Sequence, residues 1–214
     1  MADWSSRAIL FVRPGDLESE RLQLVNYLKG SLCQIEVVHN PNDKIIRFNP
    51  TLTFPILTDH GLALTGNSRL DAFFEERYPG SPLLPNDVMQ RAVVRMIADE
   101  ITDCYVSFAT DPTKAIDKIK EFATAFHPEH RWFCGPSINF IDCAIAPFFK
   151  RLDQLNILWN PTSAISDYHK RLTALLTTAI SNTTPCPTYT PEDLDEEYTD
   201  LLTDTPTYPT QNAA

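Results

Sequence analysis

The chain has 214 residues, of which 43% are hydrophobic, and its 18 basic against 28 acidic side chains give a formal net charge of −10. This negative balance argues against broad electrostatic binding to phosphate backbones, so we expect no direct contact with nucleic acid. We find neither an apolar run near the ~18–20 residues of a membrane span nor a signal-peptide pattern, and expect no membrane contact. The five cysteines are scattered without a C-x-x-C pair, which favours a reduced, cytoplasmic protein.

Strand and helix signals alternate through the first 78 residues. Strands are expected in four short runs, at 8–12, 34–39, 54–58 and 62–65. Asp16 can cap a helix that Gly30 ends, and Asp59-His60-Gly61 is a strong hairpin signal between the last two strands. A final helix is expected from about Asn67 to Tyr78. This order predicts a thioredoxin-like α/β domain over 1–78.

The segment that follows, 79–85, has no periodicity and holds three prolines, which predicts a stiff linker. From there to residue 184 the pattern is helical throughout. Four helices are expected, at about 87–108, from Pro112 to near Phe126, at 139–155 and at 163–181. The sequence therefore predicts a two-domain α+β protein, whose second domain, 86–184, is all-helical.

The last segment, 185–214, differs in composition from the rest. It carries seven acidic side chains and five prolines but no lysine or arginine, so the rest of the chain has a net charge of −10 − (−7) = −3. Such a segment cannot bury enough apolar surface to offset the entropy lost on ordering. We expect an acidic, proline-rich mobile tail, within which 192–202 could form a short helix against a partner.

Two motifs resemble the glutathione transferase superfamily. Phe54-Pro55-Ile56-Leu57 is similar to its Val-Pro-x-Leu segment, in which the proline is cis and the adjoining backbone pairs with glutathione. Asn139-Phe140-Ile141-Asp142 resembles its capping box, in which Asn139 would cap the core helix and Asp142 would reach back to the Asn139 amide. The resemblance implies a thioredoxin-like domain followed by an all-helical domain. It also implies a homodimer, α/β domain against helical domain, with a heterodimer of two such chains as the alternative.

Longer matches, spread over about 8–176, resemble the stringent starvation protein A family. They include Phe48-Asn49-Pro50, Glu76-Arg77-Tyr78-Pro79, Pro82-Leu83-Leu84-Pro85 and Asp142-Cys143-Ala144-Ile145-Ala146-Pro147. This resemblance implies a non-enzymatic transcription regulator that associates with RNA polymerase or its sigma factor during starvation or stress. The family's linker motif Pro-His-Pro-Pro-Leu is Pro-Gly-Ser-Pro-Leu here. The implied partner surface centres on Tyr78, Pro79, Pro82, Leu83 and Pro85.

The alternative function is a glutathione-binding transferase with a degraded or active site. Such an enzyme needs a hydroxyl or thiol near the start of its first helix, because that group lowers the pKa of the glutathione sulfur. The segment 13–21 offers only Ser19, and we favour the simpler interpretation that it is an ordinary first-turn helix serine. Glu18 stands where a tyrosine often lies, and a carboxylate there would oppose a thiolate.

The γ-glutamyl group of glutathione is normally held by a Glu/Gln-Ser pair at the start of the third helix. The matching positions are Gly66, which has no side chain to give, and Asn67, which could simply cap its helix. We therefore expect at most a vestigial cleft, outlined by Ser19, Phe54, Pro55 and Asn67. No catalytic residue and no cofactor are predicted, and glutathione conjugation should be negligible.

His127 and His130 are the closest histidines in the chain. No carboxylate or thiol joins them at ligand spacing, so we predict no metal site.

Overall fold

The structure is a computed structural model that describes residues 8–39, 53–59, 62–78, 80–110, 112–157 and 162–182. Its elements are β1 (Ile9–Val12), α1 (Leu17–Leu28), β2 (Gln34–Val37), β3 (Ile56–Asp59), β4 (Leu62–Thr65), α3 (Asn67–Arg77), α4 (Val88–Thr110), α5 (Pro112–Thr124), α6 (Phe140–Gln154) and α7 (Ser163–Ser181). The predicted turn at 60–61, residue 79 and the predicted tail lie outside the described residues.

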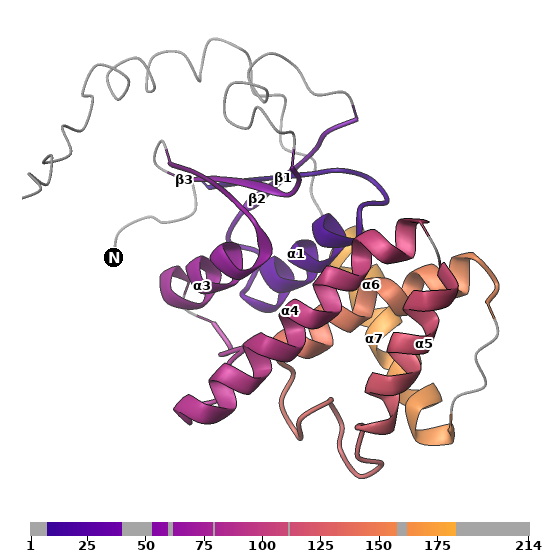
Figure 1. The fold of residues 1–214 in the computed structure, drawn as a ribbon. Helices are drawn as coiled ribbons and strands as arrows, with labels where there is room; N and C mark the ends of the chain where they lie inside the picture. The colour runs from indigo at the N-terminus through magenta and orange to yellow at the C-terminus, as the bar shows by residue number, and fades with distance from the viewer. Residues whose placement is uncertain are drawn as a thin grey trace, which may run out of the picture.

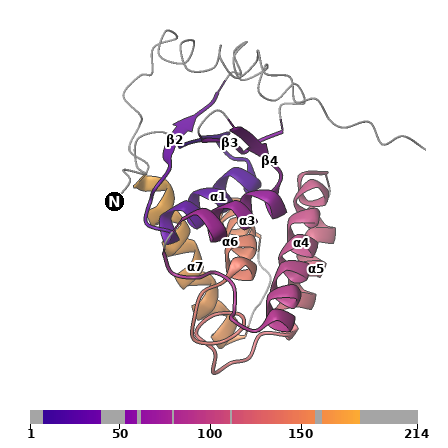
Figure 2. The same cartoon turned by 90° about the vertical axis from the view of Figure 1, so that its left-hand side faces the viewer.

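The four strands form one mixed sheet in the order β2-β1-β3-β4. β1 runs parallel to β2 and antiparallel to β3, and β3 pairs with β4 as the predicted hairpin. Helices α1 and α3 lie along one face of the sheet, and α4 to α7 lie beyond them (Figures 1 and 2). The predicted fold class, a thioredoxin-like domain followed by an all-helical domain, is confirmed.

Helix α1 lies between the sheet and the other helices, and this position explains its burial. Asp16 caps it as predicted, accepting a hydrogen bond from the N–H of Ser19 at 2.8 Å. After the helix, Gly30 takes a left-handed conformation with φ +95°. Several polar residues of α1 are buried together with its apolar ones, namely Ser19, Glu20, Arg21, Gln23 and Asn26. The helix is thus enclosed on the sides where its sequence suggests solvent.

One apolar core runs through both predicted domains. It includes Leu10 and Leu57 of the sheet, Leu24 of α1, Phe148 of α6 and Leu172 of α7, all essentially inaccessible to solvent. Because the same cluster spans the sheet and the helices, α1 serves as the shared layer between them. The boundaries 1–78, 79–85 and 86–184 stay a prediction.

The N-terminus of α6 is held by the capping box. Asn139 Oδ1 accepts from the N–H of Ile141 at 2.8 Å, and Asp142 Oδ2 accepts from the N–H of Asn139 at 2.8 Å. The other oxygen of Asp142 accepts from the hydroxyl of Tyr168 at 2.6 Å and from the N–H of Phe133 at 2.9 Å. Burial raises the pKa of Asp142 to about 6, although these hydrogen bonds oppose the shift.

No helix within the described ranges is long and apolar enough to cross a membrane. The four cysteines in those ranges are free: Cys33 and Cys143 are buried, Cys104 is half-buried and Cys134 is exposed.

Candidate functional site

Ser19, the one candidate in 13–21 for the partner of a glutathione sulfur, is buried in the first turn of α1. Its hydroxyl donates to Asp16 Oδ2 at 2.6 Å and accepts from the N–H of Arg13 at 3.0 Å. Both hydrogen bonds fix the turn that leads from β1 into α1. The structure therefore gives Ser19 a part in starting the helix.

Asn67 begins α3 but does not cap it, which corrects the alternative role considered for it. Gly66 occupies the N-cap position with φ +90° and offers no side chain. Asn67 Oδ1 instead accepts from Arg21 Nη1 at 3.4 Å. A hydrogen bond from Asn67 also lowers the pKa of Glu18, but burial, aided by the charge of Asp16, raises it above its ordinary value.

Arg21 is the residue of this region that sequence reasoning missed. It is fully buried in α1 and forms an ion pair with Asp71 of α3. One further atom on each side, Arg21 Nε and Asp71 Oδ1, is buried without a hydrogen-bond partner in the described part of the chain. A charged helix residue normally predicts solvent exposure, and nothing local marks a partner 50 positions away.

The peptide bond between Phe54 and Pro55 is cis, as predicted, and both residues are buried. The guanidinium of Arg13 lies over the Phe54 ring, 4.7 Å from its centroid, while the Arg13 N–H binds Ser19. A groove of about 620 Å³ opens beside the first turn of α1, between α4 and α6. None of the four predicted cleft residues lines it. Two of them, Ser19 and Asn67, are engaged by neighbouring protein groups.

Two of the predicted partner-binding residues, Tyr78 and Leu83, are buried, which corrects their proposed display at the surface. Tyr78 is 4% exposed, packs against Phe74 with ring centroids 5.3 Å apart, and accepts a hydrogen bond from Cys33 Sγ at 3.4 Å. Leu83 is 0% exposed, and its N–H donates to Glu75 Oε2 at 3.2 Å. Burial of apolar side chains away from water stabilises the folded state, so Tyr78 and Leu83 both anchor the linker to the core.

The other predicted partner residues lie differently. Pro82 is exposed and Pro85 is half-buried, whereas Pro79 lies outside the described residues. Gly80 occupies the position of the histidine in the related family's linker. A Cβ atom there would lie 3.1 Å from Cα and from the carbonyl oxygen of Lys29, closer than ordinary van der Waals contact. This close approach gives a physical reason for glycine at position 80.

A groove of about 960 Å³, which we call the linker groove, runs between the linker, the first turns of α4 and the loop before α6. No charged side chain is among its lining residues, although 21% of the chain is charged. The lining includes Pro82, Leu84 and Pro85 of the linker, Met89 and Val93 of α4, and Cys134, Pro136 and Ile138 of the loop. An uncharged, partly apolar surface of this size suits a protein partner.

Helix α4 presents apolar residues on two faces, and the sequence pattern did not separate them. Its core face carries Val94, Ala98, Ile101, Tyr105 and Phe108. The residues that extend the pattern at its start, Val88, Met89, Val93 and Met96, are exposed. The apolar residues in the sequence of α4 cover more than one helix face, and this excess width could have indicated a second contact surface.

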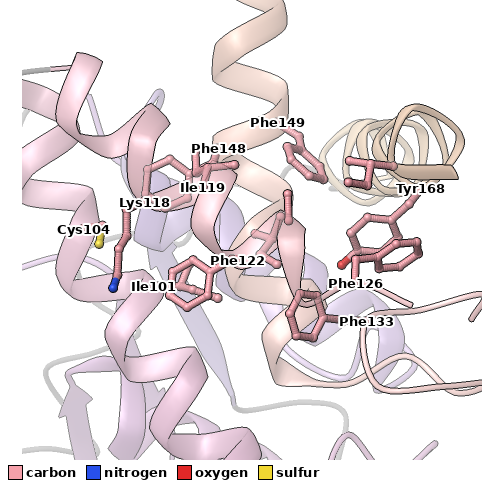
Figure 3. Close-up of a pocket in the computed structure, with 13 residues that line it drawn as sticks. Ile101, Cys104, Lys118, Ile119, Phe122, Phe126, Phe133, Phe148, Phe149 and Tyr168 are labelled. Atoms are coloured by element: carbon pink, nitrogen blue, oxygen red, sulfur yellow. The ribbon is translucent and has the colours of Figure 1, made fainter. Parts of the chain in front are cut away.

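The helical part also encloses a small apolar cavity of about 20 Å³. Figure 3 shows aromatic rings around it, among them Phe122, Phe126 and Phe133, with Cys104 and Lys118 to one side. Its volume is about that of a single water molecule, so as it stands it is a packing void. In the described ranges, no group of three or more His, Cys, Asp or Glu side chains could hold a metal ion.

Comparisons with known proteins agree with this architecture. The chain is similar to the stringent starvation protein A homolog of Coxiella burnetii, with 28% identity over 177 residues, 76% of this chain and 85% of that protein. The homolog from Histophilus somni is 25% identical over 178 residues, 76% of this chain and 84% of that protein. The solved structure of glutathione transferase Omega 3C from Trametes versicolor matches with a TM-score of 0.67 and 21% identity, over 81% of this chain and 89% of that chain. The chain has the glutathione transferase fold.

The resemblance to stringent starvation protein A proposed from the sequence is confirmed by these relatives. No protein-family model matches the chain. The lining of the linker groove includes none of the residues predicted for the glutathione cleft, Ser19, Phe54, Pro55 and Asn67. The fold therefore presents two distinct candidate sites.

Proposed function

We propose that the chain is a non-enzymatic transcription regulator that binds RNA polymerase or its sigma factor during starvation or stress, and that the linker groove is its contact surface. The observation that carries the proposal is the uncharged groove between linker, α4 and the loop before α6. The similarity to proteins named stringent starvation protein A homologs supports the class of partner. Pro82 and Pro85 are rigid, so they lose little conformational entropy on docking.

The state of the cleft supports a role other than catalysis. The hydroxyl of Ser19 is engaged by Asp16 and Arg13, and Asn67 is engaged by Arg21. A transferase needs such groups free to meet the ligand. The cis bond before Pro55 favours the alternative, a glutathione-binding transferase, because it retains the backbone turn of that superfamily.

The test of the groove compares two exposed residues on the same helix. Met89 lines the groove and is 73% exposed, whereas Val106 is 72% exposed and lies outside it. Met89→Glu should reduce capture of purified RNA polymerase holoenzyme by about tenfold, because a carboxylate would be desolvated in the contact. Val106→Glu should bind like the unmodified protein. Equal binding by all three proteins would reject the linker groove as the contact surface.

We also propose that the chain forms a homodimer through the α/β domain of one subunit and the helical domain of the other. Exposed apolar side chains at the start of α4 support this, since clustered exposed apolar side chains often mark a protein–protein contact. Val88 and Met96 belong to this patch but not to the linker groove. Val88→Glu with Met96→Glu should give a monomer in light scattering. Met89 is exposed beside these residues and also lines the linker groove, so Met89→Glu tests the polymerase contact when light scattering shows that it leaves the dimer intact. A monomeric unmodified chain at micromolar concentration would contradict the dimer.

A further inference from the structure

A second groove, of about 410 Å³, lies between the loop after α5 and the start of α7 and shares no lining residue with the linker groove. We call it the turn groove. One wall is the turn 128–131, closed by a hydrogen bond from the N–H of His130 to the carbonyl oxygen of His127 at 2.9 Å. The other wall is the start of α7, which contributes Ala164, Asp167 and Arg171. Their spacing of three and four residues places them on one helix face.

The charges of the turn groove are balanced. Its lining holds two carboxylates, two guanidinium groups and one imidazole, from Glu129, Asp167, Arg131, Arg171 and His130. With a neutral imidazole, the formal charges of these groups sum to zero, so a simple anion or a simple cation gains little net electrostatic attraction. The ion pairs in the described part of the chain involve none of the four charged residues. None of the four charges is therefore neutralised by an ion pair within the described ranges, although the Arg131 guanidinium lies 5.8 Å from the centroid of the Trp132 ring and Arg171 donates to the Arg131 carbonyl oxygen.

Two buried atoms of the turn groove lack hydrogen-bond partners. Arg171 Nη2 donates to the carbonyl oxygen of Arg131 at 2.8 Å, but Arg171 Nε is buried and unpaired. Nδ1 of His130 is in the same state. Five buried side-chain atoms are unpaired across the described residues, and two of them belong to this groove. An unpaired buried polar atom costs free energy that a ligand atom can recover.

We propose that the turn groove binds a small zwitterion of the α-amino acid class. The ligand carboxylate would pair with the guanidinium of Arg171, whose Nε offers an unused donor, and its ammonium group would pair with Asp167. A charge-assisted bond at each end matches a lining with both signs of charge. The groove volume lies in the range of small-molecule sites. This proposal does not depend on the proposed function, since no lining residue is shared with the linker groove.

The experiment titrates the full-length protein with three probes by calorimetry or ligand-observed NMR. The probes are L-alanine, which carries both charges, and its two halves, acetate and ethylammonium. We expect L-alanine to bind at least about tenfold more tightly than either half. No binding of L-alanine at about 10 mM, or affinity equal to that of acetate or ethylammonium, would overturn the proposal.

Variants locate the two ends of the ligand. Arg171→Gln should weaken the binding of L-alanine and acetate by about tenfold and leave ethylammonium binding unchanged. Asp167→Asn should weaken the binding of L-alanine and ethylammonium by about tenfold and leave acetate binding unchanged. Lys170→Gln and Asp117→Asn are matched controls, because each makes the same charge change at an exposed helix position outside the groove. Asp167 is exposed, so its variant keeps the test valid if Arg171→Gln fails to fold. Binding that the controls reduce as much as the groove variants would also overturn the proposal.

Discussion

The predicted cleft at the start of α1 and the linker groove differ in how their side chains are engaged. In the cleft, the polar groups bind one another: Ser19 holds Asp16, and Asn67 holds Arg21, which is paired with Asp71. In the linker groove, the lining is uncharged, and Met89 remains almost three-quarters exposed. In the first region the polar side chains satisfy one another within the protein, whereas in the second an uncharged surface stays exposed, which is why we propose the linker groove, and not the start of α1, as the contact site.

The largest effect is expected from removing Arg21, whose buried ion pair with Asp71 lies beside the start of α1. Arg21→Ala leaves Asp71 buried without its partner, and we expect a loss of about 3–5 kcal/mol in the free energy of unfolding. The double variant Arg21→Met with Asp71→Leu removes both charges and should lose much less. Urea denaturation measures both. The exposed pair of Lys120 and Asp117 gives a control, since Lys120→Ala should cost less than about 0.5 kcal/mol.

The second test separates the parts of the linker. Leu83→Ala should cost about 3 kcal/mol, because it empties a fully buried position, whereas Pro82→Ala at the exposed neighbour should cost less than about 1 kcal/mol. Thermal melting of the two variants measures both stability losses. Similar melting temperatures for both would contradict the division of the linker into an anchoring and a displayed part.

The third test concerns the capping box that supports the end of the linker groove, where Asn139 is part of the lining. The pKa of Asp142 is raised from 3.8 to about 6 in the folded state, so the folded chain holds this proton more tightly than the unfolded chain. The contribution of Asp142 to stability therefore falls as pH rises from about 4 to about 6 and is constant above. Relative to Asp142→Asn, the unmodified protein should lose about 2–3 kcal/mol between pH 4 and pH 7. Parallel pH profiles of the two proteins would refute this assignment.

The smallest expected effect is the binding of glutathione itself. With Ser19 engaged and Gly66 lacking a side chain, we expect a dissociation constant weaker than about 100 μM, equivalent to about −5.5 kcal/mol, and negligible conjugating activity. Calorimetry checks the affinity, with an active glutathione transferase as a positive control in the same buffer. Tighter binding would reopen the enzymatic alternative.

Local patterns predicted most of the fold but few of the contacts. The helix starts at Asp16 and Asn139 were predictable because a capping residue acts on amides two or three positions away. The partner of Arg21 lies 50 positions along the chain, and no local pattern encodes it. The proline-rich linker suggested exposure, yet the inward turn of Tyr78 and Leu83 depends on packing against distant elements.

The enclosure of α1 has a practical consequence for anyone testing the proposed partner contact with fragments of the chain. A fragment of α4 to α7 alone would expose the surfaces of α6 and α7 that α1 covers, and would leave Lys150 without Glu20, its partner at 2.6 Å. Such a fragment should be insoluble, and its failure to bind would carry no information about the proposed partner site. Surface substitutions in the intact chain are the informative reagents.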